Sequence, residues 1–258
     1  SGRDSKGQHV ANLLALQPDE RVVEVIDLKD YQQFPYLVLA TRSGLVKKTA
    51  LELYDTSRTG GIIAIKLRDG DELVNAMLVT EENDVLMVSR KGMSIRFSAG
   101  NDSMRPMGRD TSGVIGMAFR KGDELLSASV IGEAGFVFVV TEGGYAKRTS
   151  ADQYRVQKRG GIGIKVAKLD EKRGDLVGSL IVEETDEVLV VLASGKVIRT
   201  FASEVPAKGR DTMGVVFARF EDGDSVLSLA KNTERNLEAG IEAETEGAAD
   251  GEAVQPAE

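Results

Sequence analysis

Short runs of β-branched and other apolar residues, separated by turn residues, recur along the chain as far as residue 232. Four of these runs lead into a glycine turn with a basic residue four positions beyond the glycine. The glycines are Gly44, Gly92, Gly144 and Gly195, spaced by 48, 52 and 51 residues. No unit has the long 3.6-residue apolar period of an amphipathic helix. The pattern therefore predicts β-strands and turns in units of about 51 residues.

Two further features recur in the same order within each unit. One is a Gly-rich turn that leads into another apolar run, and the other is an acidic turn before a Leu/Val strand. Three features in a fixed order at a fixed spacing identify a repeat protein. The Gly-rich turns end at Gly7, Gly61, Gly113, Gly163 and Gly214, and the acidic turns begin at Asp19, Asp71, Asp123, Asp175 and Asp224.

Each unit holds about four short strands, which predicts one four-stranded antiparallel sheet per unit. A sheet this small cannot bury both faces alone, so repeated sheets stack around an axis. We therefore predict an all-β fold, a β-propeller or β-pinwheel of four-stranded blades, over residues 1–232. A half blade (1–35) precedes four full blades at about 36–83, 84–134, 135–185 and 186–232. Because Ser1 stands in the middle of a motif, we expect the chain to be a fragment of a longer protein.

Composition excludes several kinds of site. The chain has no Cys and one His, His9, which excludes disulfides, thiolate metal sites and multi-histidine centres. No apolar run is long enough for a membrane helix, and no phosphate loop or dinucleotide motif occurs. The carboxylates of the acidic turns recur in every unit and are interpreted as architecture. The sequence therefore offers no convergent nucleophile and base that would predict an active site.

The formal charge of −8 is concentrated at the C-terminal end. Residues 233–258 contain eight acids and one base among small and polar residues, which predicts a disordered acidic tail. The remaining 232 residues hold 32 bases and 33 acids, so the repeats are nearly neutral. A nearly neutral body can still carry a basic stripe if its acids lie on other turns.

The bases recur at two positions of the repeat. In a ring, equivalent positions lie at the same height and radius, so these side chains predict a basic stripe around the rim. The alternative is that they are solvated strand ends, charged to prevent edge pairing. The first set is Lys47, Lys48, Arg96, Lys147, Arg148 and Arg199, and the second is Arg58, Arg109, Lys158, Arg159 and Arg210.

The most distinctive stretch is Gln157-Lys158-Arg159-Gly160-Gly161-Ile162-Gly163. Its glycines permit close backbone approach and expose N–H groups, while Lys158 and Arg159 supply charge. These properties suit a phosphate backbone read by shape and not by base identity.

These residues resemble the C-terminal DNA-wrapping domain of the A subunit of bacterial DNA gyrase, a six-bladed β-pinwheel. The resemblance includes the Gly-Arg-Asp-x-x-Gly turns, Gly44-Leu45-Val46-Lys47-Lys48-Thr49 and Gly144-Tyr145-Ala146-Lys147-Arg148-Thr149. The stretch from Gln157 is similar to the family's heptapeptide box, Gln-Arg/Lys-Arg-Gly-Gly-Lys/Arg-Gly, and departs from it at Ile162, where the family has a base. It is similar to the additional box that some members carry in a later blade.

The resemblance implies a non-catalytic domain that wraps double-stranded DNA around its rim, tolerates sequence and supports negative supercoiling. Its implied partners are the gyrase B subunit together with the rest of the gyrase A subunit. No cofactor is implied for this domain, since ATP and Mg²⁺ belong to other parts of the holoenzyme. The implied location is the bacterial cytoplasm, in association with the nucleoid.

Two alternatives remain open from the sequence. The first is the related pinwheel of the topoisomerase IV A subunit, against which the nearly complete box and the regular repeats argue. The second is a protein-interaction propeller of the WD40 or kelch kind. The absence of Trp and the regular base four residues after the glycine argue against it.

The acidic tail generates a first testable prediction. If residues 233–258 compete with DNA for a basic rim, ending the chain at Asn232 should tighten DNA binding, most strongly at low salt. Titration of duplex DNA against the two chains measures this effect. Equal affinities would refute the competition.

Overall fold

The computed structural model describes residues 21–26, 33–58, 61–221 and 223–232. Strands and turns dominate these residues, and their only helices are short 3-10 turns, so the all-β prediction is confirmed. Within this part of the chain no helix has the length and apolar character needed to cross a membrane. The acidic tail and most of the half blade lie outside the described residues.

Each repeat contributes a tight hairpin and, after a longer connection, a third strand. The hairpins are β1 (Tyr36–Thr41) with β2 (Leu45–Ala50), β4 (Asp84–Ser89) with β5 (Met93–Ser98), β8 (Phe136–Thr141) with β9 (Tyr145–Ser150), and β12 (Glu187–Leu192) with β13 (Val197–Phe201). The third strands are β3 (Leu73–Val79), β7 (Leu125–Ile131), β11 (Leu176–Val182) and β15 (Val226–Lys231). Three of the hairpins are followed by 3-10 turns, η2 (Leu51–Tyr54), η3 (Ala151–Gln153) and η4 (Ala202–Glu204).

The fourth strand of a sheet comes from the following repeat. These strands have two residues each, and they are β6 (Val114–Ile115), β10 (Ile164–Lys165) and β14 (Val215–Val216). The sheets have the orders β3-β1-β2-β6, β7-β4-β5-β10 and β11-β8-β9-β14, all with antiparallel pairing. The expectation that each unit builds its own four-stranded sheet is therefore wrong in its connectivity. In the described residues the last sheet has three strands, β15-β12-β13.

Glycine allows this exchange, because the Gly-rich segment must pass very close to the preceding repeat. Gly113 has a φ of +89°, and a Cβ there would overlap the carbonyl oxygen of Val46 on β2. Beyond it, the amides of Gly116 and Met117 both donate to the carbonyl of Gly44, at 2.9 and 3.1 Å. The same pattern recurs at the next two junctions, where Gly92 and Gly144 accept.

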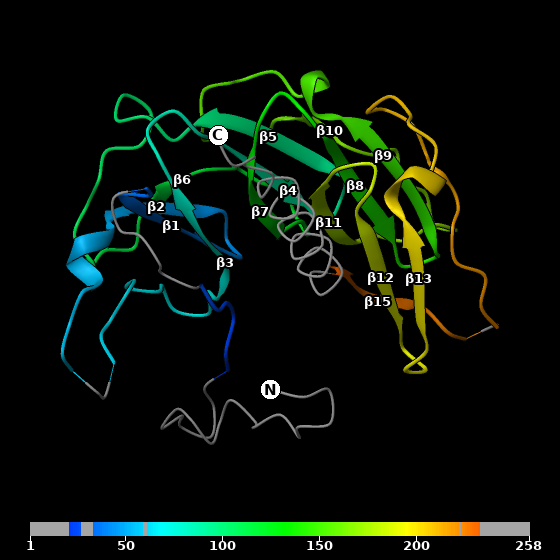
Figure 1. The fold of residues 1–258 in the computed structure, drawn as a ribbon, viewed down its shortest axis with the longest axis horizontal. Coiled ribbons are helices and arrows are strands. Elements are labelled where there is room, and N and C mark those ends of the chain that lie inside the picture. Colours follow the sequence, from blue (N-terminus) through cyan, green and yellow to red (C-terminus); the bar gives the residue numbers. More distant parts are fainter. Residues whose placement is uncertain (1–20, 27–32, 59–60, 222, 233–258) are drawn as a thin grey trace, which may run out of the picture.

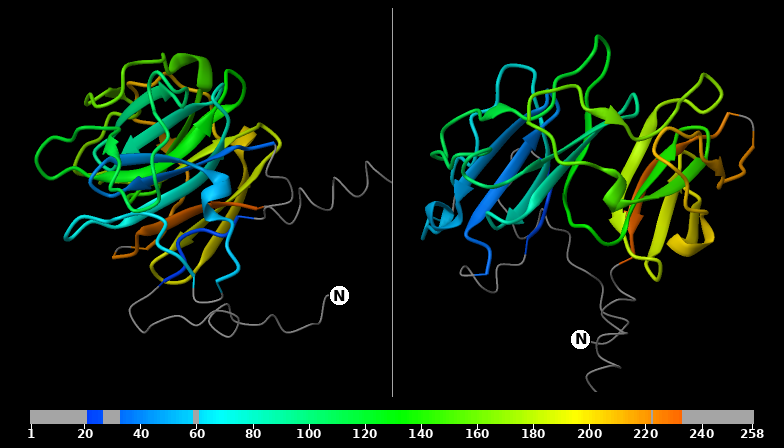
Figure 2. Two further views of the ribbon diagram at one scale, coloured as in Figure 1. Left: turned by 90° about the vertical axis from the view of Figure 1, so that its left-hand side faces the viewer. Right: turned by 90° about the horizontal axis from the view of Figure 1, so that it is seen from above.

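The four sheets follow one another along an open arc, from β1 to β13 (Figure 1). Seen from above, they run from the blue strands of the first repeat to the yellow and orange strands of the last (Figure 2). The inner strands β3, β7, β11 and β15 contact one another in turn. Since the strand order of each sheet runs outward from there, β6, β10 and β14 lie at the outer edge. We call this edge the rim.

The core lies between successive sheets. Strand β4 is buried on both faces, since Val85 and Met87 pack toward the first sheet while Leu86 and Val88 pack toward the third. Alternate residues of β8 divide in the same way between two core clusters. This double burial explains why the hairpin strands read as continuous apolar runs.

The exchange generates a prediction for Gly163, which has a φ of +80° and would place a Cβ into the carbonyl oxygen of Ser94 on β5. Replacing Gly163 by Ala should strain the backbone and separate β10 from β5, lowering the free energy of unfolding by at least about 2 kcal/mol. Urea denaturation measures the change. The matched control is Gly209→Ala, because the nearest atoms to a Cβ there are 3.9 and 4.0 Å away. Equal losses in the two variants would contradict the steric argument.

Candidate nucleic-acid interface

The Gly-rich segments of successive repeats join along the rim into one continuous band. It comprises residues 61–66, 108–118, 159–168 and 209–219, and we call it the rim band. At each junction one backbone amide donates to the next repeat's segment: Lys66 to Thr111, Ala118 to Gly161 and Lys168 to Thr212, each at 3.0 Å. The band therefore keeps the same geometry from one repeat to the next.

At the same junctions, one arginine side chain per repeat donates a hydrogen bond to the preceding repeat. Arg109, Arg159 and Arg210 each lie four residues before the last glycine of their Gly-rich turn. Each donates Nη1 at 3.0 Å to the residue two positions after the equivalent glycine of the preceding repeat. The three acceptors are the carbonyls of Ile63, Ile115 and Lys165. These arginines are partly exposed, so they brace the rim band and also add charge to it.

Lys47 and Lys147, predicted to contact DNA, are buried at 0% and 1% exposure. The Lys47 amine donates to the carbonyls of Ala64, at 2.5 Å, and Arg109. The Lys147 amine donates to the carbonyls of Gly209, at 2.8 Å, and Arg210. Both lysines therefore bind the Gly-Arg-Asp turn of the following repeat through its main-chain carbonyls. Burial lowers the pKa of each amine to about 8.

Three of the four bases that lie four residues after the turn glycine are also buried. Lys48 donates to the Ala99 carbonyl at 2.6 Å, Arg96 to the Tyr154 carbonyl at 3.2 Å, and Arg148 to the Val205 carbonyl at 2.7 Å. Each acceptor belongs to the following repeat, and two of the bases also pair with acids, Arg96 with Asp84 and Glu133 and Arg148 with Glu184.

The prediction that the first set of bases forms an exposed stripe is therefore wrong for five of its six members. Lys47, Lys48, Arg96, Lys147 and Arg148 fasten one repeat to the next, because the following repeat covers the strand that carries them. Arg199 is exposed, since within the described residues no fourth strand pairs with β13.

The predicted box divides into parts with different roles. Lys158 is exposed and Arg159 is partly exposed, so both present charge on the rim. The amide of Gly160 donates to Gly116 at 2.7 Å, and Gly163 is required by the close approach to Ser94. Gly161 is exposed, with no atom nearer than 3.8 Å to a Cβ placed there.

Gln157, the first residue of the box, is fixed by its backbone. Its amide donates to the Arg96 carbonyl at 2.7 Å. Its side-chain Nε2 is buried and has no hydrogen-bond partner in the described part of the chain. The box therefore combines structural glycines with two cations at the surface.

Sequence reasoning missed a third recurring base, five residues after the last glycine of each Gly-rich turn. Lys66, Lys168 and Arg219 occupy this position and are exposed, while the second repeat has Ala118. Their shared offset from the glycines was the signal available in the sequence. Together with Arg58, which is also exposed, they place cations on the rim in the first, third and fourth repeats.

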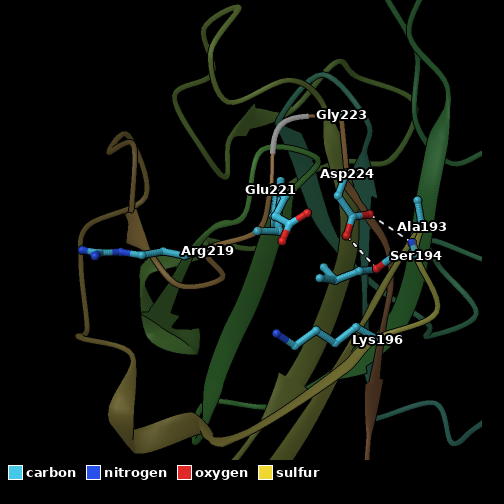
Figure 3. Close-up of a pocket in the computed structure, with 9 residues that line it drawn as sticks. Ala193, Ser194, Lys196, Arg219, Glu221, Gly223 and Asp224 are labelled. Carbon is cyan, nitrogen blue, oxygen red and sulfur yellow. Dashed lines mark hydrogen bonds between the residues drawn. The ribbon is translucent and has the colours of Figure 1, made fainter.

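A hollow of about 790 Å³ lies at the last repeat, lined in part by Ser194, Lys196, Arg219 and Asp224. Ser194 donates its hydroxyl to Asp224 at 2.7 Å, and Arg219 extends away from this pair (Figure 3). The turn glycines of the three earlier hairpins are covered here by the following repeat, whereas none of the described residues has an atom within 4 Å of a Cβ placed at Gly195. The hollow is therefore the face of the fourth repeat that the described residues leave uncovered.

Comparison with known proteins identifies one family. The family model described as DNA gyrase C-terminal domain, beta-propeller, matches residues 35–80, 83–131, 135–183 and 186–232. The DNA gyrase A subunit of Streptomyces coelicolor is 57% identical over 244 residues, which cover 93% of this chain and 28% of that protein. The DNA gyrase A subunit of Mycolicibacterium smegmatis is 52% identical, over 92% of this chain and 28% of that protein. The chain thus spans little more than a quarter of these relatives.

Two solved structures share the fold. A DNA gyrase A C-terminal domain superposes with a TM-score of 0.76 at 32% identity, covering 88% of this chain and 76% of that one. The C-terminal domain of a DNA topoisomerase IV superposes with a TM-score of 0.82, covering 92% and 75%. Because its identity is 23%, this second likeness shows the fold alone. The resemblance to the gyrase domain is therefore confirmed.

The buried lysines generate a prediction about pH. The pKa of Lys147 is about 8 in the folded chain against 10.5 ordinarily, so between these values the unfolded chain binds more protons. Its contribution to the free energy of unfolding should therefore rise as the pH rises from 8 to 10.5, by up to about 1.4 kcal/mol per pH unit. Urea denaturation of the wild type and Lys147→Met at pH 7.5 and 10 measures the difference. Parallel pH profiles would contradict a depressed pKa.

Proposed function

Since the chain belongs to the family of DNA gyrase C-terminal domains, we propose that its rim binds double-stranded DNA and bends the duplex around the arc of sheets. The observation that carries this proposal is the rim band. Hydrogen bonds fix it across four repeats, and it presents cations in consecutive repeats at equivalent positions.

The cations on the band suit a phosphate backbone. Lys168 is exposed on the band, Lys158 is exposed immediately before its third segment, and Arg159 is partly exposed while it braces the preceding repeat. Contacts with phosphates fix the register of a duplex without reading its bases. Binding through this surface is therefore sequence-tolerant.

The free-energy cost of bending the duplex must be offset by these contacts. Bending a site of 20–30 bp by 40–90° costs roughly 1–6 kcal/mol. Each phosphate neutralised by a cation releases counterions and makes the affinity more salt-dependent. A rim with recurring cations can offset the cost over several repeats, since the cations follow the direction of the bend.

Within a longer protein, we assign this domain the task of holding DNA and no bond-breaking chemistry. Its partners are then a gyrase B subunit together with the rest of a gyrase A subunit, in the bacterial cytoplasm at the nucleoid. ATP and Mg²⁺ are bound by other parts of that assembly, and the domain itself uses no cofactor. The names of the relatives and the match to the gyrase C-terminal family support placing the domain within a gyrase A subunit.

The proposal predicts a steep salt dependence. Titrations of duplex DNA at several salt concentrations should give a linear fall of log K with log salt, with a similar affinity for unrelated sequences. Replacing Lys158 by Ala should weaken every sequence alike and reduce the slope by about one. The matched control is Lys172→Ala, because Lys172 is exposed but precedes the inner strand β11. A flat salt profile or a strict sequence preference would sink the proposal.

A further inference from the structure

A row of apolar side chains follows the rim band at one position of the repeat. This position lies two residues after the last glycine of each Gly-rich turn and is occupied by Ile63, Ile115, Lys165 and Val216, which we call the rim row. The apolar members are 62%, 52% and 49% exposed. Apolar side chains scattered singly on a surface need no explanation. Their recurrence in three of four repeats, at equivalent points of one edge, needs an explanation.

The fold does not account for these side chains. The main chain of the row is already held, because Ile63, Ile115 and Lys165 accept the arginine bonds from the following repeat. The side chains add little to the core, since about half or more of each stays exposed. Exposed β-branched apolar residues on an edge strand also favour unwanted pairing with other chains. Threonine would satisfy the same backbone preference without that liability.

Arginines lie beside the first member of the row. Ile63 lines a hollow of about 550 Å³ on the rim together with Leu53, Ile62, Arg58 and Arg109, so apolar side chains and two arginines share one lining; Gly61 and the acidic Asp110 complete it.

The same association continues along the rim. At the second repeat Ile115 lies against the box, since a Cβ at Gly160 would be 3.9 Å from its Cγ2. At the third repeat the position itself is a lysine, Lys165, which is exposed and pairs with Asp211 at 3.2 Å. A ligand that matches this surface must therefore carry negative charge and apolar groups side by side at regular intervals.

We propose that the rim row contacts the deoxyribose carbons of a DNA backbone held by the neighbouring cations. This inference rests on the proposed function, and it adds to that function an apolar component of binding. A nucleic-acid backbone alternates phosphates with the C–H faces of its sugars, which is the pattern that the row and its cations match. The affinity for DNA then has a part that salt does not screen.

Threonine substitutions test the row while retaining branching at Cβ. The variants are Ile115→Thr and the triple change Ile63→Thr, Ile115→Thr and Val216→Thr. Ile115→Val is the matched apolar control, since the fourth repeat has Val216 at this position. Each chain is titrated with a duplex oligonucleotide and with inorganic polyphosphate, a polyanion without sugars, over a range of salt. Thermal unfolding verifies that each variant is folded.

We expect Ile115→Thr to weaken DNA binding about threefold and the triple variant about tenfold or more. The slope of log K against log salt should stay unchanged, because no cation is removed. Polyphosphate binding should also stay unchanged, and Ile115→Val should bind DNA nearly as tightly as the wild type.

Three results would overturn the inference. DNA affinity unchanged in the triple variant would show that the row faces no duplex and would point to a protein partner. Equal losses for DNA and polyphosphate would assign the effect to a distorted rim. A reduced salt slope would mean that cations had been displaced. By contrast, a wild-type chain that binds no DNA would refute the proposed function itself.

Discussion

The structure depends on the entry of each Gly-rich segment into the outer edge of the preceding sheet. At every junction the carbonyl of a turn glycine, Gly44, Gly92 or Gly144, accepts two amides from the following repeat. The contact is so close that a Cβ at Gly113 or Gly163 would overlap the facing main chain. Since a small sheet cannot bury both faces alone, this exchange joins the repeats and lets each one complete its neighbour.

The exchange also decides what the basic residues do. It brings main-chain carbonyls of one repeat over the hairpin of the preceding one, within reach of its buried lysine and arginine side chains. A buried carbonyl needs a donor, and a long cationic side chain reaching up from the hairpin supplies one. Lys47 and Lys147 do so beneath the Gly-Arg-Asp turns, as Arg148 does at Val205. Five of the eleven basic residues predicted to contact DNA therefore stabilise the junctions between repeats, and the charge available to a ligand lies along the rim.

The sequence was sufficient for the period, the all-β class and the stacking of small sheets, because glycine turns and apolar runs such as residues 136–141 are local signals. It could not assign β6, β10 and β14 to their sheets. A fourth strand that pairs within its own repeat and one that pairs with the preceding repeat give the same spacing in the sequence. It could not separate Lys147 from Lys158 either. Both are lysines in the third repeat, and only the position of the following repeat makes one buried and the other exposed.

Arg199 shows that a basic residue of the hairpin is buried only where a following repeat covers it. It has the same offset from its turn glycine as Arg96 and Arg148, yet it is exposed while they are 4% and 8% exposed. The sequence around it is of the same kind, and what differs is that no following repeat lies against β13 in the described residues. The electrostatic character of a residue in this fold is thus a property of a pair of repeats. The sequence of a single repeat shows which residues are charged. Which of these charges are exposed on the rim depends on how the repeats stack.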